Sequence, residues 1–591
     1  MTTPNAVESR SASGFTEPSA RSLYWLMLAV VAAVTLSVFS GVRHADFVPW
    51  DDDINIYGNP HIRGITAGSL KWMFTDTAYV HRYMPIGWLM FAIDYQFAHR
   101  FNPATYHIGN LILHTLNAVL VFVLLTQLLR KAKPGVSSRA LPLAAAIGAL
   151  FWSIHPLRVE PVAWSSARIY QAAMFFVLIS TLAYLKFAKD GNRRLFYGIA
   201  IFFFLLAALT YPIVVGFPFL LVALDLYPFQ RIAFAREKLL SPEARKVWLE
   251  KLPFFAISAL MVAATLWNRT AATRFMPTAS LEEFGLFQRL AQGFYTWAAY
   301  LWKTCWPVNL SPSYTELLDF QWWGPRFLCS FLLVTGITCL FVRQRGRWPA
   351  ALPLWMAYLA LLFPMLGLTE HPHYVYDRYS FLVGVLCAAP VAWFVLHVWP
   401  KVRARAVVFG SASAALVVLG GLSLRQTEIW NNAQTFLPYL ISQLGEHPVR
   451  AKQDLVYGVI LMRDERFAEA EKSFRNAIQF NPTIRDAHTY LGDVLADQQK
   501  LSEAIMAYHR ALELNANDLR ARQGLAVAFA GLKRFDEAVA EFKQVLLLDA
   551  KNVNALHNLA VTLGQMGQKE LAMDYYRQAQ EIRGSTDRAS R

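Results

Sequence analysis

The chain has 591 residues, of which 55% are hydrophobic and only 16% are charged. A soluble globular protein has about 25% charged residues, so the composition excludes a wholly soluble protein. The net charge of +15 does not indicate nucleic-acid binding, because residues 450–591 hold 20 Lys and Arg against 19 Asp and Glu, and nearly all of the excess lies in the first 449 residues.

Long apolar runs predict helices that cross a membrane. The clearest are residues 23–42, 106–129, 252–268, 326–342, 350–369 and 406–424. About 20 apolar residues are enough to span a bilayer as a helix. We interpret residues 1–22 as a cytoplasmic tail and the first run as a membrane helix, since it is long for a signal peptide and no clear cleavage site follows.

Basic loops predict the orientation of this membrane domain, because Lys and Arg gather on the cytoplasmic side. Alternating spans between the basic loops leave four segments outside: 43–105, 155–168, 269–325 and 370–378. The solution has about 11 spans within residues 23–428, an inside N-terminus and an outside C-terminal domain. It requires the amphipathic stretch 287–305 to lie along the outer surface. If this stretch crosses instead, the C-terminal domain is cytoplasmic.

The first outer loop, 43–105, carries Asp51, Asp52 and Asp53 a few residues after a membrane helix. Mutual repulsion makes three adjacent carboxylates costly unless solvent, a metal ion or a positive ligand offsets it. One interpretation is a solvated acidic cap. The other is a catalytic group that removes a proton from a hydroxyl at the membrane boundary. Carboxylate oxygens also suit a divalent cation such as Mg²⁺ or Mn²⁺, and the sequence leaves a metal undecided.

Two later outer segments combine His, Arg and Glu near helix ends. Cations at this level suit an anionic leaving group, whereas the alternative is interfacial anchoring by Arg, His and Tyr. The candidates for binding a donor phosphate or substrate are Arg378, His155, Arg158, Glu160, His371, His373 and Arg168.

The C-terminal part repeats every 34 residues. Ala470, Ala504, Ala538 and Ala572 show this spacing, as do Phe474, Tyr508, Phe542 and Tyr576. A 34-residue period is typical of the tetratricopeptide repeat (TPR), a pair of helices. We expect a linker at 429–449, about four repeats over 450–586 and a tail at 587–591. The fold class is therefore all-α, a polytopic membrane helix bundle followed by a TPR solenoid.

Stacked TPR pairs form a concave groove that suits a peptide. The expected acceptor-binding residues are Asp454, His488 and Arg522. The alternatives for this domain are a passive spacer and a dimerisation surface.

Several ordered motifs give the chain a resemblance to a known family. They are Asp51-Asp52-Asp53 with Asn59-Pro60, residues 102–111, His155 through Trp164, residues 306–310, and Asp377-Arg378-Tyr379. Over nearly its whole length, the chain resembles bacterial relatives of the transmembrane-and-TPR O-mannosyltransferases within the GT-C glycosyltransferase superfamily.

The resemblance implies a polyprenyl-phosphate-linked sugar donor and an acidic catalytic group in the first outer loop, for which we favour Asp52. The chain also departs from the family pattern. Where relatives often read Trp-His-Pro-Leu, it has Tyr83-Met84-Pro85-Ile86. Where they often read Glu-Arg-Lys-Asp, it has Ala167-Arg168-Ile169-Tyr170, and a frequent Lys-Pro is Tyr211-Pro212.

We therefore expect a membrane sugar transferase in a bacterial inner membrane, with the active site and TPR domain on the periplasmic side. The expected partners are the lipid-linked donor, a Ser/Thr-bearing protein or peptide acceptor and membrane lipids, but no nucleic acid. One alternative is transfer to a glycolipid or surface polysaccharide. The other is a non-catalytic membrane-anchored TPR scaffold.

Overall fold

The computed structural model describes residues 18–77, 79–98, 101–190, 194–239, 241–272, 280–318, 321–368 and 373–589. The chain divides into two compact units, Met1–Phe436 and Leu437–Arg591. Apart from one isolated bridge between Tyr314 and Val375, the regular structure of the described residues is helical. The predicted all-α fold class is confirmed.

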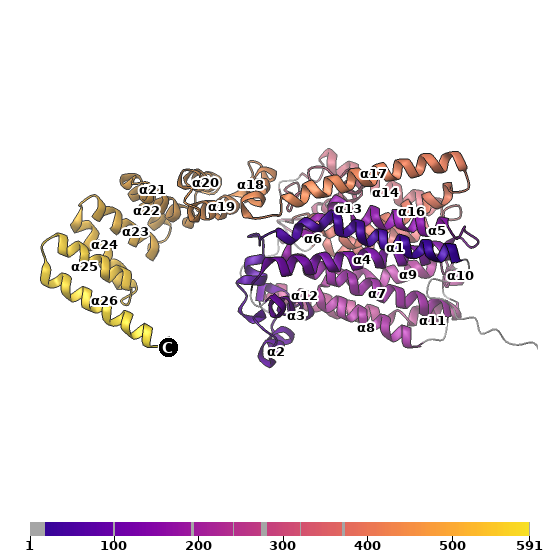
Figure 1. Cartoon of the computed structure of the whole chain (residues 1–591), viewed down its shortest axis with the longest axis horizontal. Helices are drawn as coiled ribbons and strands as arrows, with labels where there is room; N and C mark the ends of the chain where they lie inside the picture. Colours follow the sequence, from indigo (N-terminus) through magenta and orange to yellow (C-terminus); the bar gives the residue numbers. More distant parts are fainter. Residues whose placement is uncertain are drawn as a thin grey trace, which may run out of the picture. The chain divides into compact units, whose positions relative to one another are not determined.

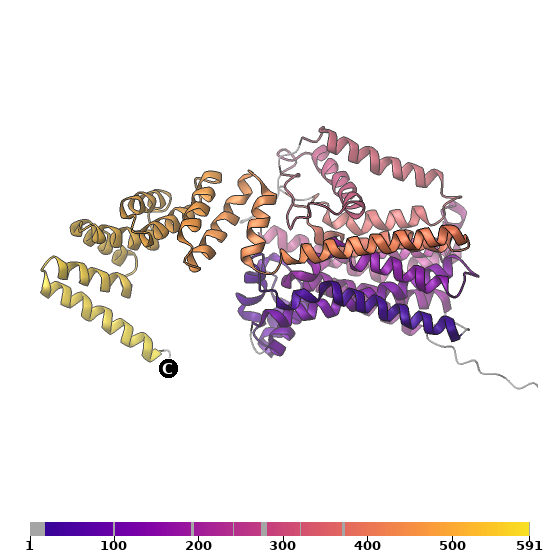
Figure 2. The same cartoon turned by 45° about the horizontal axis from the view of Figure 1, so that its top comes forward.

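The first unit is built from helices that run alongside one another, as Figures 1 and 2 show for α1, α4 and α7. Its helices are α1 (Pro18–Phe39), α2 (Ala67–Thr75), α3 (Pro85–Ala98), α4 (Pro103–Ala132), α5 (Ala140–Ser153), α6 (Val159–Ala163), α7 (Arg168–Asp190), α8 (Arg194–Thr210), α9 (Phe217–Leu226), α10 (Arg236–Leu239), α11 (Pro242–Leu249), α12 (Leu252–Ala272), α13 (Leu286–Cys305), α14 (Pro325–Arg343), α15 (Ala351–Leu362), α16 (Ser380–Val398) and α17 (Val402–Glu428).

Six stretches of this unit are long and apolar enough to cross a membrane, so the chain is a multi-pass membrane protein. They are Pro18–His44, Pro103–Ala132, Ser165–Lys189, Pro325–Arg343, Asp377–Val398 and Ala404–Glu428. Two bent pairs, one around each of the junctions α5–α6 and α11–α12, raise the number to eight if each is one span. The predicted count of about 11 further requires that three shorter apolar helices cross: Arg194–Thr210, Pro212–Leu226 and Ala351–Met365.

One end of this bundle gathers four segments that are distant in sequence, and we call it the site end. The segments are residues 45–59, 154–168, 306–318, and 365–380 without 369–372. Trp164 donates to the Trp50 carbonyl at 2.6 Å, and Tyr314 donates to Asp377 at 2.7 Å. Ser423 at the end of α17 donates to the Ile154 carbonyl at 2.8 Å.

Positive residues mark the opposite end. Helices α4 and α7 begin at the site end, where the Arg168 guanidinium donates to the Tyr106 carbonyl. Their last turns carry Arg130 and Lys131 in α4 and Lys189 in α7. The cytoplasmic location of the opposite end, which we infer from these basic residues, stays a prediction.

Helix α13 lies across the site end. Near its start Arg289 donates to the Leu368 carbonyl at 2.5 Å, and near its end the Thr304 carbonyl lies 3.1 Å from Nε2 of His155. Both partners belong to the site end, and α13 is not among the candidate spans. The placement of residues 287–305 along the outer membrane surface stays a prediction.

The predicted linker 429–449 contains a helix, α18 (Ala433–Leu444). Just before it and in its first turn, Trp430 and Phe436 are buried, with their ring centroids 4.7 Å apart. Trp430 also packs against Trp164, and Phe436 against Trp50. The chain therefore leaves the first unit at the site end.

The second unit contains four helix pairs whose first helices begin 34 residues apart, as the sequence period predicts. They are α19 (Ala451–Arg463) with α20 (Phe467–Phe480), α21 (Arg485–Asp497) with α22 (Leu501–Leu514), α23 (Leu519–Gly531) with α24 (Phe535–Leu548), and α25 (Val553–Gln565) with α26 (Lys569–Ala589). One continuous apolar core, including Phe474, Tyr508 and Phe542, runs through these repeats.

A small residue facing an aromatic ring sets the close approach of the two helices in a repeat. A Cβ atom on Gly492 would overlap the Tyr508 ring, and one on Gly458 would overlap Phe474. The turn between the two helices holds a left-handed residue in each repeat, namely Glu465, Gln499, Lys533 and Gly567.

We predict opposite effects for two glycine substitutions in residues 437–591, which have their own core. Gly492→Ala forces the Tyr508 ring to move and should destabilise the unit by about 1–3 kcal/mol. Gly564→Ala, whose Cβ meets nothing within 4 Å, should stabilise it by about 0.5–1 kcal/mol. Urea unfolding followed by circular dichroism measures both, and an equal effect of the two substitutions would contradict this account of helix packing.

Candidate active site

The three adjacent carboxylates of the first loop have different surroundings. Asp52 is fully buried, Asp53 is exposed, and the Asp51 side chain is 33% exposed. Asp51 has a φ of 65°, a left-handed conformation that is uncommon for a residue other than glycine. The triplet therefore does not fit a shared cation site for Mg²⁺ or Mn²⁺. Among the residues that the structure describes, no group of three or more His, Cys, Asp and Glu is placed to hold a metal ion.

Asp52 links the first loop to the segment before α7 by hydrogen bonds. Its Oδ1 accepts hydrogen bonds from the Ser166 amide at 2.9 Å and the Ser166 hydroxyl at 2.6 Å. Its Oδ2 accepts from the Val48 amide at 3.1 Å. Burial raises the pKa of Asp52 to about 7, although these hydrogen bonds act in the opposite direction. A pKa near neutrality suits a general base, but the carboxylate is enclosed by protein.

Glu160 and Arg378 form a short, buried ion pair. The Arg378 amide donates to Glu160 Oε2 at 2.7 Å, and Nη1 donates to Oε1 at 2.5 Å. Nε donates to the Tyr170 hydroxyl at 3.1 Å. The guanidinium carbon lies 3.7 Å from the centre of the Tyr376 ring and 4.9 Å from that of Trp164. Aromatic faces attract a cation, so carboxylate and rings together hold Arg378 in place.

Asp51 has a second arginine, Arg82, as its partner. The two side chains meet at a single contact of 3.4 Å and are 33% and 34% exposed. Arg82 also lies near Tyr211, Tyr170 and Arg378. The Asp51–Arg82 pair therefore lies beside the Glu160–Arg378 pair.

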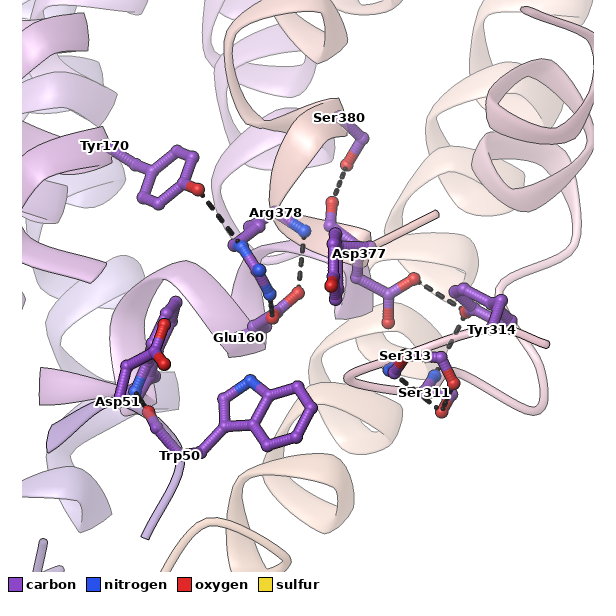
Figure 3. Close-up of polar contacts among 12 residues, drawn as sticks. Trp50, Asp51, Glu160, Tyr170, Ser311, Ser313, Tyr314, Asp377, Arg378 and Ser380 are labelled. Carbon is purple, nitrogen blue, oxygen red and sulfur yellow. Dashed lines mark hydrogen bonds and ion pairs between the residues drawn. The ribbon is translucent and has the colours of Figure 1, made fainter. Parts of the chain in front are cut away.

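The structure brings the first loop, the turn around Glu160 and the segment 373–380 together, as the proposed topology requires. In Figure 3, Asp51 and Trp50 lie on one side of the Glu160–Arg378 pair, and Asp377 and Tyr314 lie on the other. The buried Trp50 Nε1 has no hydrogen-bond partner, and Figure 3 shows it pointing toward the ion pair. The cluster combines one partly exposed carboxylate (Asp51), two guanidinium groups (Arg82 and Arg378) and the unpaired N–H donor of Trp50.

Two of the predicted phosphate ligands, Arg158 and His155, make hydrogen bonds to other protein groups and do not face the cluster. Arg158 donates to the carbonyl and hydroxyl oxygens of Ser380 at 2.8 and 2.9 Å. His155 accepts at Nδ1 from the Leu157 amide, and its Nε2 contacts the Thr304 carbonyl. Both side chains are 2% exposed. They tie the turn after α5 to α16 and α13.

The remaining predicted ligands do not join the cluster. Arg168 donates to Asn110 and pairs with Asp94 at 2.8 Å, with both charged groups buried. His373 is buried with Nε2 at 3.1 Å from the Met365 carbonyl. His371 lies outside the described residues. Of the predicted donor-binding set, Arg378 and Glu160 are the members beside Asp51.

The predicted groove residues of the second unit make contacts within the repeats. Arg450 pairs with Asp454 at 2.8 Å, and Arg522 pairs with Glu541 at 2.9 Å. Nε2 of His488 lies 3.1 Å from the Pro482 carbonyl. These contacts stabilise the repeats, and a role in binding an acceptor stays a prediction.

A small apolar recess adjoins the cluster through Tyr170. It is lined otherwise by Ala173, Met174, Ile213, Val214, Phe381 and Leu382, and its free volume of about 10 Å³ is room for about one water molecule. These residues belong to α7, α16 and the turn after α8. A polar cluster and an apolar recess thus meet at Tyr170.

The sequence reasoning missed Arg82, Trp50 and Tyr170 as members of the cluster. Trp50 directly precedes the acidic triplet, and an indole N–H donor at that position could have marked it as a site residue. Arg82 follows Val80, whose φ is 52°, and no residue pattern predicts the turn that directs this arginine toward Asp51. Tyr170 and Tyr211, two of the departures from the family pattern, meet with their hydroxyls 3.3 Å apart.

Comparison with known families identifies the repeats. Three models described as tetratricopeptide repeat match residues 458–518, 495–560 and 553–586. The chain is similar to the human protein named Protein O-mannosyl-transferase TMTC4, with 29% identity over 182 residues, which is 29% of this chain and 24% of that protein. The mouse protein of the same name is 29% identical over 189 residues, or 30% and 25% of the two chains. The chain thus spans about a quarter of the length of these relatives.

Solved structures resemble a similar fraction of the chain. MamA is 18% identical with a TM-score of 0.25, and the match covers 26% of this chain and 93% of that one. YrrB, a TPR protein with an unusual peptide-binding site, is 25% identical with a TM-score of 0.24, and the match covers 25% and 76%.

We predict a pH dependence of stability that comes from Asp52. In the unfolded chain its carboxyl titrates near the usual pKa of about 4, whereas burial raises the pKa to about 7 in the folded protein. The folded state therefore binds this proton more tightly. The resulting stabilisation is complete at low pH and is lost as the pH rises through the folded pKa. Between about pH 4 and 7 the melting temperature of the wild type should fall relative to that of Asp52→Asn, and above that range the difference should stay constant. Parallel curves would show that Asp52 does not titrate in this range.

Proposed function

We propose that this protein transfers a sugar from a polyprenyl-phosphate-linked donor to a hydroxyl acceptor at the cluster around Asp51. The observation that carries the proposal is the meeting of Asp51, Glu160 and Arg378 at one end of a membrane helix bundle. The partial similarity to proteins named O-mannosyl-transferase supports sugar transfer. A lipid-linked donor suits a site at this position, because its chain can stay in the bilayer while the sugar reaches the loop.

Asp51 is the proposed general base, in place of Asp52. A base must reach the proton that it removes, and the Asp51 side chain is partly exposed whereas Asp52 is enclosed by Ser166 and Val48. Strained non-glycine residues concentrate at functional sites, and Asp51 has a φ of 65°. In this proposal Asp52 positions the loop that carries Asp51.

The reaction is a single displacement at the anomeric carbon. Asp51 takes the proton of the acceptor hydroxyl, the acceptor oxygen bonds to the anomeric carbon, and the bond from that carbon to the phosphate oxygen breaks. The electron pair of the broken bond leaves with the polyprenyl phosphate. Positive potential from Arg378 and the N–H group of Trp50 stabilises the developing negative charge.

The departures from the family pattern at positions 170 and 211 favour a working site over a lost one. Where relatives often carry Asp and Lys, this chain has Tyr170 and Tyr211, and the two hydroxyls lie in contact. Tyr170 also accepts a hydrogen bond from Nε of Arg378. The replacement suits a donor that differs from that of the relatives.

The TPR unit is the proposed holder of a protein acceptor. Its chain continues from Trp430 and Phe436 at the site end, which we place on the extracytoplasmic side of a bacterial inner membrane. Holding Ser- or Thr-bearing segments there raises their effective concentration at the membrane.

We predict that Asp51→Asn lowers the rate of sugar transfer by about 100-fold or more, the usual contribution of a general base. Asp53→Asn is the matched control, since it removes the same charge from the neighbouring exposed residue, and its rate should stay within about twofold of the wild type. Transfer is measured in proteoliposomes with a polyprenyl-phosphate-linked sugar and membrane-protein extracts as acceptor. Full activity of Asp51→Asn would reject Asp51 as the base.

We also predict that removal of residues 437–591 separates chemistry from acceptor capture. The first unit keeps its own site, so hydrolysis of the donor or transfer to a small hydroxyl compound should continue, while transfer to protein falls by about 100-fold, as expected for lost effective concentration. Unchanged transfer to protein would show that the TPR unit does not hold the acceptor.

A further inference from the structure

The two ion pairs of the cluster differ in how tightly they are held. Glu160 and Arg378 are 3% and 8% exposed and meet at 2.5 Å, and the Arg378 amide binds the same carboxylate. Asp51 and Arg82 are each about one third exposed and share a single contact of 3.4 Å. An exposed, single-contact pair contributes little to stability. Either residue of the Asp51–Arg82 pair can therefore change its partner at a low cost in free energy.

Each residue of the Asp51–Arg82 pair lies in or near strained backbone. Asp51 has a φ of 65°, and Val80, two residues before Arg82, has a φ of 52°. A β-branched residue such as valine is a genuine outlier in this region, and such strain concentrates at ligand clamps and switch regions. The loop thus maintains the contact between Asp51 and Arg82 at a local cost in free energy.

Arg82 also faces a second cation. Its charge interacts unfavourably with that of Arg378 and favourably with Asp51. Each guanidinium is at present neutralised by one carboxylate. An anion that entered the cluster would interact favourably with both cations, and Arg82 is the one whose carboxylate is easily displaced.

We infer that the Asp51–Arg82 ion pair keeps the Asp51 carboxylate occupied until the phosphate of the lipid-linked donor displaces it from Arg82. We call this ion pair the lock. The phosphate takes the place of the Asp51 carboxylate on Arg82, and the released carboxylate becomes free to accept the proton of the acceptor hydroxyl. Donor binding therefore precedes activation of the acceptor. The inference rests on the proposed function and adds an order of events to it.

The charges balance at each step of this sequence. The donor is a phosphodiester with one negative charge, and the polyprenyl phosphate that leaves gains the electron pair of the broken bond. Asp51 gains the proton and becomes neutral. Arg82 therefore keeps its anionic partner until the lipid phosphate departs, and the lock closes when Asp51 has lost its proton to water.

The experiment measures binding of farnesyl phosphate, a short isoprenyl phosphate, to the full-length protein in detergent, with farnesol as the ligand that lacks the phosphate. Four proteins form a cycle: wild type, Arg82→Gln, Asp51→Asn and the double variant. The controls are Lys71→Gln and Asp53→Asn, which change the same charges at exposed positions of the same loop. Size-exclusion chromatography and thermal melting establish that each variant is folded.

Arg82→Gln should weaken binding by about tenfold or more, because a charge-assisted hydrogen bond is lost. Asp51→Asn should tighten binding by about threefold to tenfold, because the competing carboxylate is gone. The tightening should largely vanish when Arg82 is already Gln, and the two controls should bind as the wild type does. Additive effects in the cycle would overturn the lock.

The other outcomes separate this inference from the proposed function. Phosphate-dependent binding that Arg82→Gln leaves unchanged overturns the lock but is compatible with the transferase. Equal binding of farnesyl phosphate and farnesol by the wild type overturns both. If Arg82→Gln does not fold, Asp51→Asn decides alone, since failure to tighten binding contradicts a competing carboxylate.

Discussion

The ion pair between Glu160 and Arg378 joins segments that lie 218 residues apart in sequence, and the arrangement of the site end depends on it. Removing either partner leaves a buried charge without compensation, at a cost of about 3–5 kcal/mol. Glu160 shares a short turn with Trp164, whose indole binds the Trp50 carbonyl. These two contacts together fix the first loop, the turn after α5 and the start of α16 relative to each other.

Most charged residues at the site end are used by the fold itself. Arg168 holds Asp94 and Asn110, Arg158 holds Ser380, and Asp52 holds Ser166. Such contacts make the site rigid, and a rigid surround supports preorganised catalysis. A reaction also needs groups that can change partners, and the partly exposed Asp51 and Arg82 meet that requirement.

The sequence predicts the architecture well, because its signals are periodic or long. A 34-residue spacing indicates the repeats, apolar runs indicate the spans, and alternation of basic loops places the acidic triplet and Arg378 on one side. It does not show which carboxylate of the triplet is accessible, since that depends on the left-handed conformation of Asp51. Nor does residue type distinguish a guanidinium that is available to a substrate from one such as Arg158, which binds the carbonyl and hydroxyl oxygens of Ser380. Arg82 was missed for the same reason, because its direction comes from a strained turn.

The most direct measurement is a structure of the full-length protein in a lipid nanodisc with bound polyprenyl phosphate. We predict a phosphate within hydrogen-bond distance of Arg82, with the Glu160–Arg378 pair intact and Asp51 separated from Arg82. A phosphate bound at the opposite end of the bundle, or a bound lipid with no phosphate near Asp51, would contradict it.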